Sequence, residues 1–230
     1  MQLSTEVRWF FKEGDELAAI LNWFESFGQR LTPANFERAD FYLLLPGINN
    51  LGLKIREPRQ ADGDGWSGRL EAKVLTRDLG ALQLENGSVG NGNQWAKFSF
   101  QVKEGDETLN AVLNSFLLPK INSAERNHWI KMEKNRLLVF YDQQHKSFSA
   151  DGVNIKEGCG IELTAIRIHE QLDYSFAFES FSSSGQQEEN FFEALNVFFS
   201  EVQLPPFQGN RSFGYPSFLL EKIPPTTLNG

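Results

Sequence analysis

The sequence predicts an α+β protein built on an eight-stranded antiparallel β-barrel, with a charged interior and flanking helices. The first observation is that apolar and charged residues alternate, as in Leu51–Arg56. Successive side chains of a strand point to opposite faces, so Leu53 and Ile55 share an apolar face while Lys54 and Arg56 share a cationic one. The second observation is that this alternation recurs along the whole chain, which is typical of a closed barrel with an apolar outside and a polar lumen.

The N-terminal third predicts a strand, a helix and a second strand. Alternating residues predict the first strand over 3–12. Apolar residues at helical spacing predict a helix near 15–28, with Asp15 as its N-cap and Gly28 after its end. Residues 35–45 form the next predicted strand, which Pro and Asn turn residues separate from strand 51–56. The helix is expected to cover one side of the sheet.

The middle of the chain predicts two further strands, 70–75 and 95–102, separated by polar loops. One loop is Pro58 to Gly68, and the other is Glu85 to Asn93. The second loop contains GSVGNGN, but a phosphate-binding loop needs its glycines to lead into a helix. A strand follows instead, so neither loop is expected to bind a nucleotide.

A helix near 106–118 comes next, capped by Asp106 and stopped by Pro119. Two strands are predicted over 128–134 and 136–142, with Lys134-Asn135 as a tight turn between them. A short extended piece follows near 147–155.

The C-terminal part predicts an antiparallel pair of strands and a final helix. The strands are 160–168 and 174–181, and the helix is 188–203 with acidic residues at its start. A Pro-rich tail begins at about residue 205, and no element is predicted in it.

Length and composition predict one domain, residues 1–230, of the globular class. Hydrophobic residues make up 40% of the chain and Phe alone contributes 21, which argues against disorder. The net charge of −8 does not favour nucleic-acid or anionic-membrane binding, unless positive charge is concentrated locally. The single cysteine, Cys159, excludes an intramolecular disulfide, and no stretch has the length of a membrane span or the apolar run of a signal peptide. A cytoplasmic protein is expected.

The repeated basic positions carry the functional hypothesis. Unpaired charges away from bulk water are costly, so basic side chains inside a barrel need anionic partners. Two sources of negative charge remain open: a bound polyanion, or carboxylates of the chain itself on neighbouring strands. The basic residues are Lys54, Arg56, Lys73 and Lys131, and the carboxylates that would pair with them are Glu71, Glu133 and Glu179.

The order of these segments resembles the CYTH superfamily of triphosphate tunnel metalloenzymes. The segments that carry the likeness are DFYLLLPGINNLGLKIRE, LEAKVL, WIKMEKNR, GCGIELTA and GYPSFLL, over roughly residues 5–220. The resemblance implies an eight-stranded tunnel in which basic residues grip a triphosphate and glutamates hold Mg²⁺ or Mn²⁺. Lys54, Arg56, Lys73 and Lys131 match the family's basic positions.

The acidic motifs of that family are only partly present. The family's first strand carries Glu-x-Glu-x-Lys, and here Glu6 is followed by Arg8 and Phe10 at the other two positions. A later Glu-x-Glu is represented by Glu162 and Thr164, while Asp151 loosely matches a further acidic ligand. The resemblance therefore implies a metal site of Glu6, Glu162 and Asp151, and a substrate site of Arg8, Lys54, Arg56, Lys73 and Lys131.

Two functions follow from this pattern. The first is metal-assisted hydrolysis of a small-molecule polyphosphate or nucleoside triphosphate, in which the ion orients the phosphate for attack by water. The second is binding of such a polyanion, or of protein partners, by a catalytically degraded tunnel. The guanidinium of Arg8 motivates the second, because it can contact a phosphate oxygen directly where the family has a metal ligand.

Overall fold

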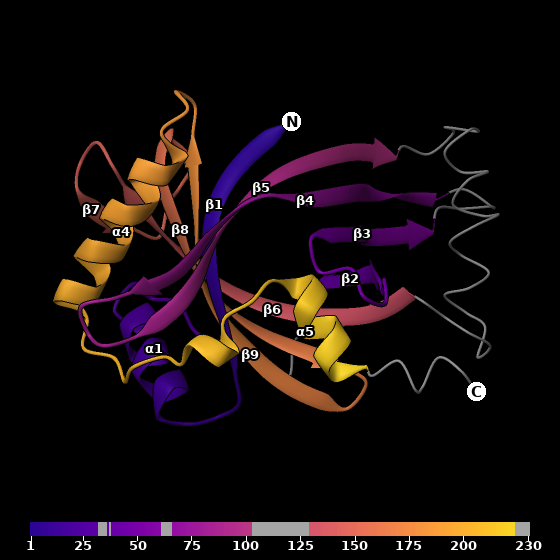
Figure 1. The fold of residues 1–230 in the computed structure, drawn as a ribbon, viewed down its shortest axis with the longest axis horizontal. Helices are drawn as coiled ribbons and strands as arrows, with labels where there is room; N and C mark the ends of the chain where they lie inside the picture. Colours follow the sequence, from indigo (N-terminus) through magenta and orange to yellow (C-terminus); the bar gives the residue numbers. More distant parts are fainter. Residues whose placement is uncertain (32–35, 37, 61–65, 103–128, 224–230) are drawn as a thin grey trace.

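The predicted closed antiparallel barrel is confirmed. A computed structural model describes residues 1–31, 36, 38–60, 66–102 and 129–223. Strands follow one another in the order β2-β3-β4-β5-β1-β9-β8-β6, and pairing of β2 with β6 closes the ring of eight (Figure 1). A ninth, short strand, β7, pairs with the C-terminal end of β6. Every pairing is antiparallel, so closure leaves the eight main strands without a long free edge.

The elements follow the sequence prediction closely in order and type. The strands are β1 (Gln2–Phe11), β2 (Arg38–Leu43), β3 (Leu51–Gln60), β4 (Trp66–Gln83), β5 (Val89–Val102), β6 (Trp129–Asp142), β7 (Ser147–Ser149), β8 (Glu157–Ile168) and β9 (Gln171–Ser182). The helices are α1 (Asp15–Glu25), α4 (Gln187–Glu201) and α5 (Tyr215–Lys222), with one 3-10 turn, η2 (Gly209–Arg211). The helix predicted at 106–118 lies outside the described residues.

Four local predictions are wrong. Asp15 is the first residue of α1 and not its N-cap, which is Gly14. The loop predicted from Pro58 to Gly68 is shorter at both ends, because β3 reaches Gln60 and β4 begins at Trp66. The expected turn at Lys134-Asn135 does not exist, because β6 runs without interruption from Trp129 to Asp142 and pairs with β8 along most of its length. The loop predicted to extend to Asn93 ends earlier, since β5 already begins at Val89. Gly90 allows this strand to lie directly on β1: a Cβ at that position would come 2.5 Å from the Trp9 ring.

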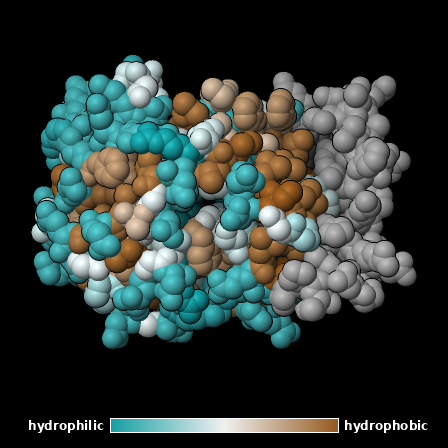
Figure 2. Space-filling model, in the orientation of Figure 1, coloured by the Kyte–Doolittle hydropathy of each residue, from teal (hydrophilic) through white to brown (hydrophobic). Residues whose placement is uncertain are grey.

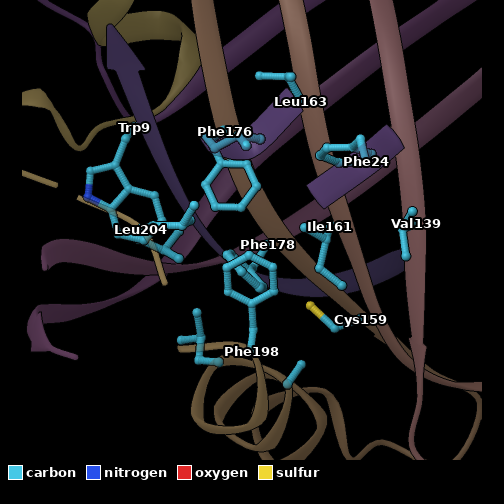
Figure 3. Close-up of a cluster of buried hydrophobic side chains, with 14 of the residues drawn as sticks. Trp9, Phe24, Val139, Cys159, Ile161, Leu163, Phe176, Phe178, Phe198 and Leu204 are labelled. Carbon is cyan, nitrogen blue, oxygen red and sulfur yellow. The ribbon is translucent and has the colours of Figure 1, made fainter. Parts of the chain in front are cut away.

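The main hydrophobic core lies outside the barrel, between strands β1, β6, β8 and β9 and the helices α1 and α4. Figure 3 shows Trp9, Phe176, Phe178 and Phe198 gathered there. Cys159 is fully buried in the same cluster. Figure 1 shows α1 and α4 together on one side of the barrel, with α5 apart from them. This packing is what leaves the opposite faces of the same strands to form the lumen.

One end of the lumen is apolar and is filled by α5. Phe10 from β1 and Met132 from β6 are buried there, and Phe218 of α5 stacks on Phe10 with ring centroids 4.1 Å apart. No element was predicted in this part of the chain. Pro216 does not prevent the helix, because it lies in the first turn, where no intrahelical N–H bond is lost.

The remaining surface is mixed. Figure 2 shows hydrophobic surface in the region of β3, β4 and β5. Val74 of β4 and Phe98 and Phe100 of β5 are exposed. Among the described residues, no helix is long and apolar enough to cross a membrane.

Candidate functional site

A cavity of about 160 Å³ lies in the lumen, and charged side chains from most strands of the barrel line it. Four of the five predicted basic residues are part of its wall: Arg8 from β1, Lys54 and Arg56 from β3, and Lys73 from β4. The two-residue period of the strands accounts for this, because each of these residues alternates with an outward-facing apolar neighbour. The structure therefore brings together the cations that the sequence singled out.

Four more cations line the same cavity and were not predicted. They are Arg38 from β2, Lys97 from β5, and Lys134 and Arg136 from β6. In total, eight cationic and four anionic side chains line the cavity. The lumen is therefore positive, although the chain as a whole carries a net charge of −8.

Glu71 is the acid with the most cationic partners. It is 3% exposed, its Oε2 lies 3.0 Å from Lys54 Nζ, and its Oε1 lies 3.3 Å from Arg56 Nη1 and 3.6 Å from Lys97 Nζ. Burial raises the pKa of the Glu71 carboxyl, but Lys54, Arg56 and Lys97 outweigh it and lower that pKa to about 2. One carboxylate thus serves three cations of the cavity wall, of which Lys54 has a second anionic partner in Asp40.

Lys73 is held between two acids. Its Nζ contacts Glu6 and lies 3.0 Å from Glu179 Oε1. Burial raises the pKa of the Glu179 carboxyl, but the nearby charges of Lys73 and Arg8 lower it to about 2. The pairs Lys73–Glu179 and Lys54–Glu71 agree with the ion-pairing alternative that the sequence left open.

Arg8, on β1, pairs with an acid of β8. Its Nη1 donates to Glu162 Oε1 at 2.9 Å and to Ser175 Oγ at 3.0 Å, and its side chain is 5% exposed. Glu162 is also 3.2 Å from Arg136 Nη1 and accepts from Thr164 Oγ1 at 2.8 Å. Burial raises the pKa of the Glu162 carboxyl, but Arg8 and Arg136 bring it well below its usual range. A guanidinium thus sits beside the acid that the resemblance assigned to a metal.

Asp40 is a buried acid that the sequence analysis did not identify. It is 0% exposed, and its Oδ2 lies 3.0 Å from Arg38 Nη2 and 3.3 Å from Lys54 Nζ. Burial raises the pKa of this carboxyl, but the charges of Lys54, Lys134 and Arg38 outweigh burial, so the pKa lies below its usual value. Asp40 belongs to the run DFYLLL, where a single acid among apolar residues gave no motif.

Lys134 and two tyrosines form the floor of the cavity. Lys134 Nζ donates to the Tyr42 hydroxyl at 2.8 Å and lies 3.6 Å from the centroid of the Tyr215 ring. Burial, followed by the charge of Lys54, brings the pKa of the Lys134 amine well below its usual range, whereas the aromatic contact favours the charged form. Tyr215 comes from α5, so the C-terminal helix completes the site.

Buried donors on the cavity wall are left without partners. Arg8 Nε, Arg56 Nε and Trp95 Nε1 make no hydrogen bond within the described part of the chain. A buried donor without an acceptor costs roughly 1–3 kcal/mol. The wall therefore has an excess of both positive charge and hydrogen-bond donors, and a ligand rich in acceptor oxygens would supply what it lacks.

Lys131 does not belong to this site, which corrects its assignment to the basic set. It lies on the other face of β6 from Lys134 and Arg136, its side chain is 55% exposed, and its Nζ is 2.9 Å from Glu133 Oε1. Lys134 takes the place in the lumen that was expected of Lys131.

Two of the three predicted metal ligands, Glu6 and Glu162, line the cationic cavity, but the third does not join them. Glu6 pairs with Lys73, Glu162 pairs with Arg8 and Arg136, and Asp151 lies in an exposed loop that borders a different surface pocket. Within the described ranges, no group of three His, Cys, Asp or Glu side chains could hold a metal ion. Hard divalent cations prefer several oxygen ligands, so this set of residues does not fit such an ion.

The site and the fold define a closed β-barrel with a cationic tunnel. No protein-family model matches the chain, and no curated protein matches its sequence. Among solved structures, the chain is similar to the PH1819 protein from Pyrococcus horikoshii OT3, with 17% identity, a TM-score of 0.44, and coverage of 95% of this chain and 99% of that one.

Two adenylyl cyclase candidates are also similar. HpAC1 from Hippeastrum, which is described as having a dominant triphosphatase activity, shares 13% identity over 96% of this chain and 95% of its own, with a TM-score of 0.41. A protein from Bacillus halodurans shares 12% identity over 90% of this chain and 95% of its own, with a TM-score of 0.42. All three TM-scores are below 0.5, so the function of this chain is argued from its own site.

Proposed function

We propose that the tunnel binds a small-molecule polyphosphate or a triphosphate-containing anion. The observation that carries this proposal is the imbalance of charge around the cavity, where four acids of the wall and the buried Asp40 serve eight basic side chains. Charged groups removed from water need partners, and the acids of the wall are too few to pair with each cation singly. A polyanion would neutralise the excess.

The arrangement of the cations favours a chain of phosphates over a single anion. They come from β1, β2, β3, β4, β5 and β6 and so face the cavity from several directions. Arginine gives planar, paired hydrogen bonds to phosphate oxygens, and lysine gives a compact charge. An extended anion with oxygens on all sides can use both kinds of group at once.

Turnover is the second candidate function, and it rests on the sequence resemblance. A hydrolase would need Mg²⁺ or Mn²⁺ at Glu6 and Glu162, and both carboxylates are engaged by cations of the wall. The contact between Arg8 and Glu162 favours binding without metal, because a guanidinium supplies charge but does not activate water.

Thermal unfolding with tripolyphosphate in the presence of a chelator tests the proposal. A ligand that binds only the folded state raises the melting temperature by mass action. We expect a rise for the wild type and for Lys131→Ala, whose lysine lies outside the tunnel, and no rise for the double variant Lys54→Ala, Arg56→Ala. A wild type that does not respond at millimolar tripolyphosphate would exclude polyanion binding. Phosphate release that appears only with Mn²⁺ or Mg²⁺ would favour the hydrolase.

A further inference from the structure

The cationic tunnel continues into a second cavity whose wall is partly apolar. This annex, of about 190 Å³, is bordered by Leu138, Phe140, Gly160 and Phe181. It shares Arg8, Lys97, Arg136, Glu162 and Glu179 with the cationic cavity. The two spaces are therefore neighbours along one lumen, separated only by side chains that border both.

The strand register places the annex directly beyond the charged layer. On β6, Leu138 and Phe140 follow Arg136 on the same face, and on β9, Phe181 follows Glu179. Between them, Gly160 of β8 pairs with Phe140 on one side and with Glu179 on the other. At the same level of the lumen, the inward-facing residues of the three adjacent strands β6, β8 and β9 thus change from charged side chains to apolar side chains or glycine.

The apolar side chains of the annex are fixed but incompletely covered. Leu138, Phe140 and Phe181 are half-buried, and the two rings meet edge to face with centroids 6.2 Å apart. Gly152 lies close against the Phe140 ring, since a Cβ there would come 2.5 Å from Phe140 Cε2. The loop that contains Gly152 therefore packs closely against the Phe140 ring and holds it in place.

We propose that the annex binds one compact aromatic group carried by the phosphorylated ligand of the tunnel. This inference rests on the proposed function, because the phosphates would lie beside Arg8 and Arg136 while the ring lies against Phe140 and Phe181. A cavity of about 150 Å³ lined by apolar side chains can hold benzene, so about 190 Å³ accommodates a single ring better than a whole nucleoside. The preferred ligand is then an aryl ester of a polyphosphate.

Two esters of triphosphate distinguish the contribution of the ring to binding from that of the phosphates. The monophenyl and monomethyl esters carry the same charge, so a difference in their dissociation constants reports on the annex alone. Burying a phenyl ring is worth enough that we expect the phenyl ester to bind about tenfold to hundredfold more tightly, by titration calorimetry of the intact protein.

Gly160→Val is the decisive variant, because its side chain would occupy the annex. A Cβ at this position meets Leu138 Cδ1 at 3.4 Å and Phe140 Cε1 at 4.0 Å, which are ordinary contacts. We expect Gly160→Val to bind both esters equally and still to bind tripolyphosphate, which shows that the variant folds. Phe181→Ala should also lose the preference for the phenyl ester, and Phe192→Ala, on the exposed face of α4, should keep it.

The outcomes distinguish the two proposals. If both esters bind the wild type equally, or if Gly160→Val retains the preference, the annex does not hold the ring and the tunnel proposal stands. If neither ester nor tripolyphosphate binds the wild type, both proposals are wrong.

Discussion

Replacing Glu71 by glutamine would remove the carboxylate that serves three cations of the tunnel. The pKa of this carboxyl is about 2 in the folded protein, against an ordinary value of 4.5. A difference of that size corresponds to about 3 kcal/mol of stability at neutral pH. For a domain of this length, we expect the melting temperature of Glu71→Gln to fall by about 6–12 °C.

The same substitution should strengthen the binding of tripolyphosphate. Lys54, Arg56 and Lys97 would lose their shared partner, so phosphate oxygens would meet less competition for them. We therefore expect tripolyphosphate to raise the melting temperature of Glu71→Gln more than that of the wild type, and so to recover part of the lost stability.

Glu133→Gln is the matched control, because Glu133 also contacts two cations, Lys131 and Arg167, but does so outside the cavity. Differential scanning fluorimetry with and without tripolyphosphate measures all three proteins. An equal response of wild type and Glu71→Gln to the anion would refute the idea that Glu71 and phosphate compete for the same cations.

Two further predictions concern stability. The carboxyls of Glu71 and Glu179 have pKa values lowered to about 2, so their contribution to stability is complete above about pH 4.5 and is lost as the pH falls towards 2. Urea unfolding at several pH values should show this loss of stability, and the loss should be smaller in Glu71→Gln. Phe218→Ala removes a ring that is 1% exposed and stacked on Phe10, and should cost about 3–5 kcal/mol in chemical denaturation. A cost below about 1 kcal/mol would mean that α5 does not hold this end of the barrel closed.

The sequence predicts the barrel and half of its cationic wall for one physical reason. A strand reverses its side chains at every residue, so alternation identifies which residues share a face. Lys54, Arg56 and Lys73 were found in this way. Alternation within one strand does not reveal which residues of distant strands meet, and this is why Asp40 and Lys97 were missed.

The two wrong assignments on β6 have a common origin. A turn placed at Lys134-Asn135 interrupts the strand and removes Lys134 from consideration as a wall residue. In the continuous strand, Lys134 and Arg136 face the lumen and Lys131 faces outward. Lys134 is tolerated in mid-strand because its amine donates to the Tyr42 hydroxyl and lies over the Tyr215 ring. These partners come from β2 and α5, which are far away in the sequence.

The helix α5 is a second element that local sequence patterns do not predict. Proline residues around it suggest an irregular tail, yet Pro216 fits the first helical turn and Phe218 fills the end of the barrel. The stability of this short helix comes from the cavity that it closes, which the sequence alone does not display.

The separation of charge between lumen and exterior has a consequence for the kinetics of binding. The chain carries −8 overall while its cavity is positive, so the rest of the molecule is more negative than the total. An approaching polyanion is repelled at long range and attracted only near the mouth, and salt screens the distant repulsion more strongly than the buried attraction. Added salt should thus accelerate association even where it weakens affinity, which is the reverse of ordinary electrostatic steering.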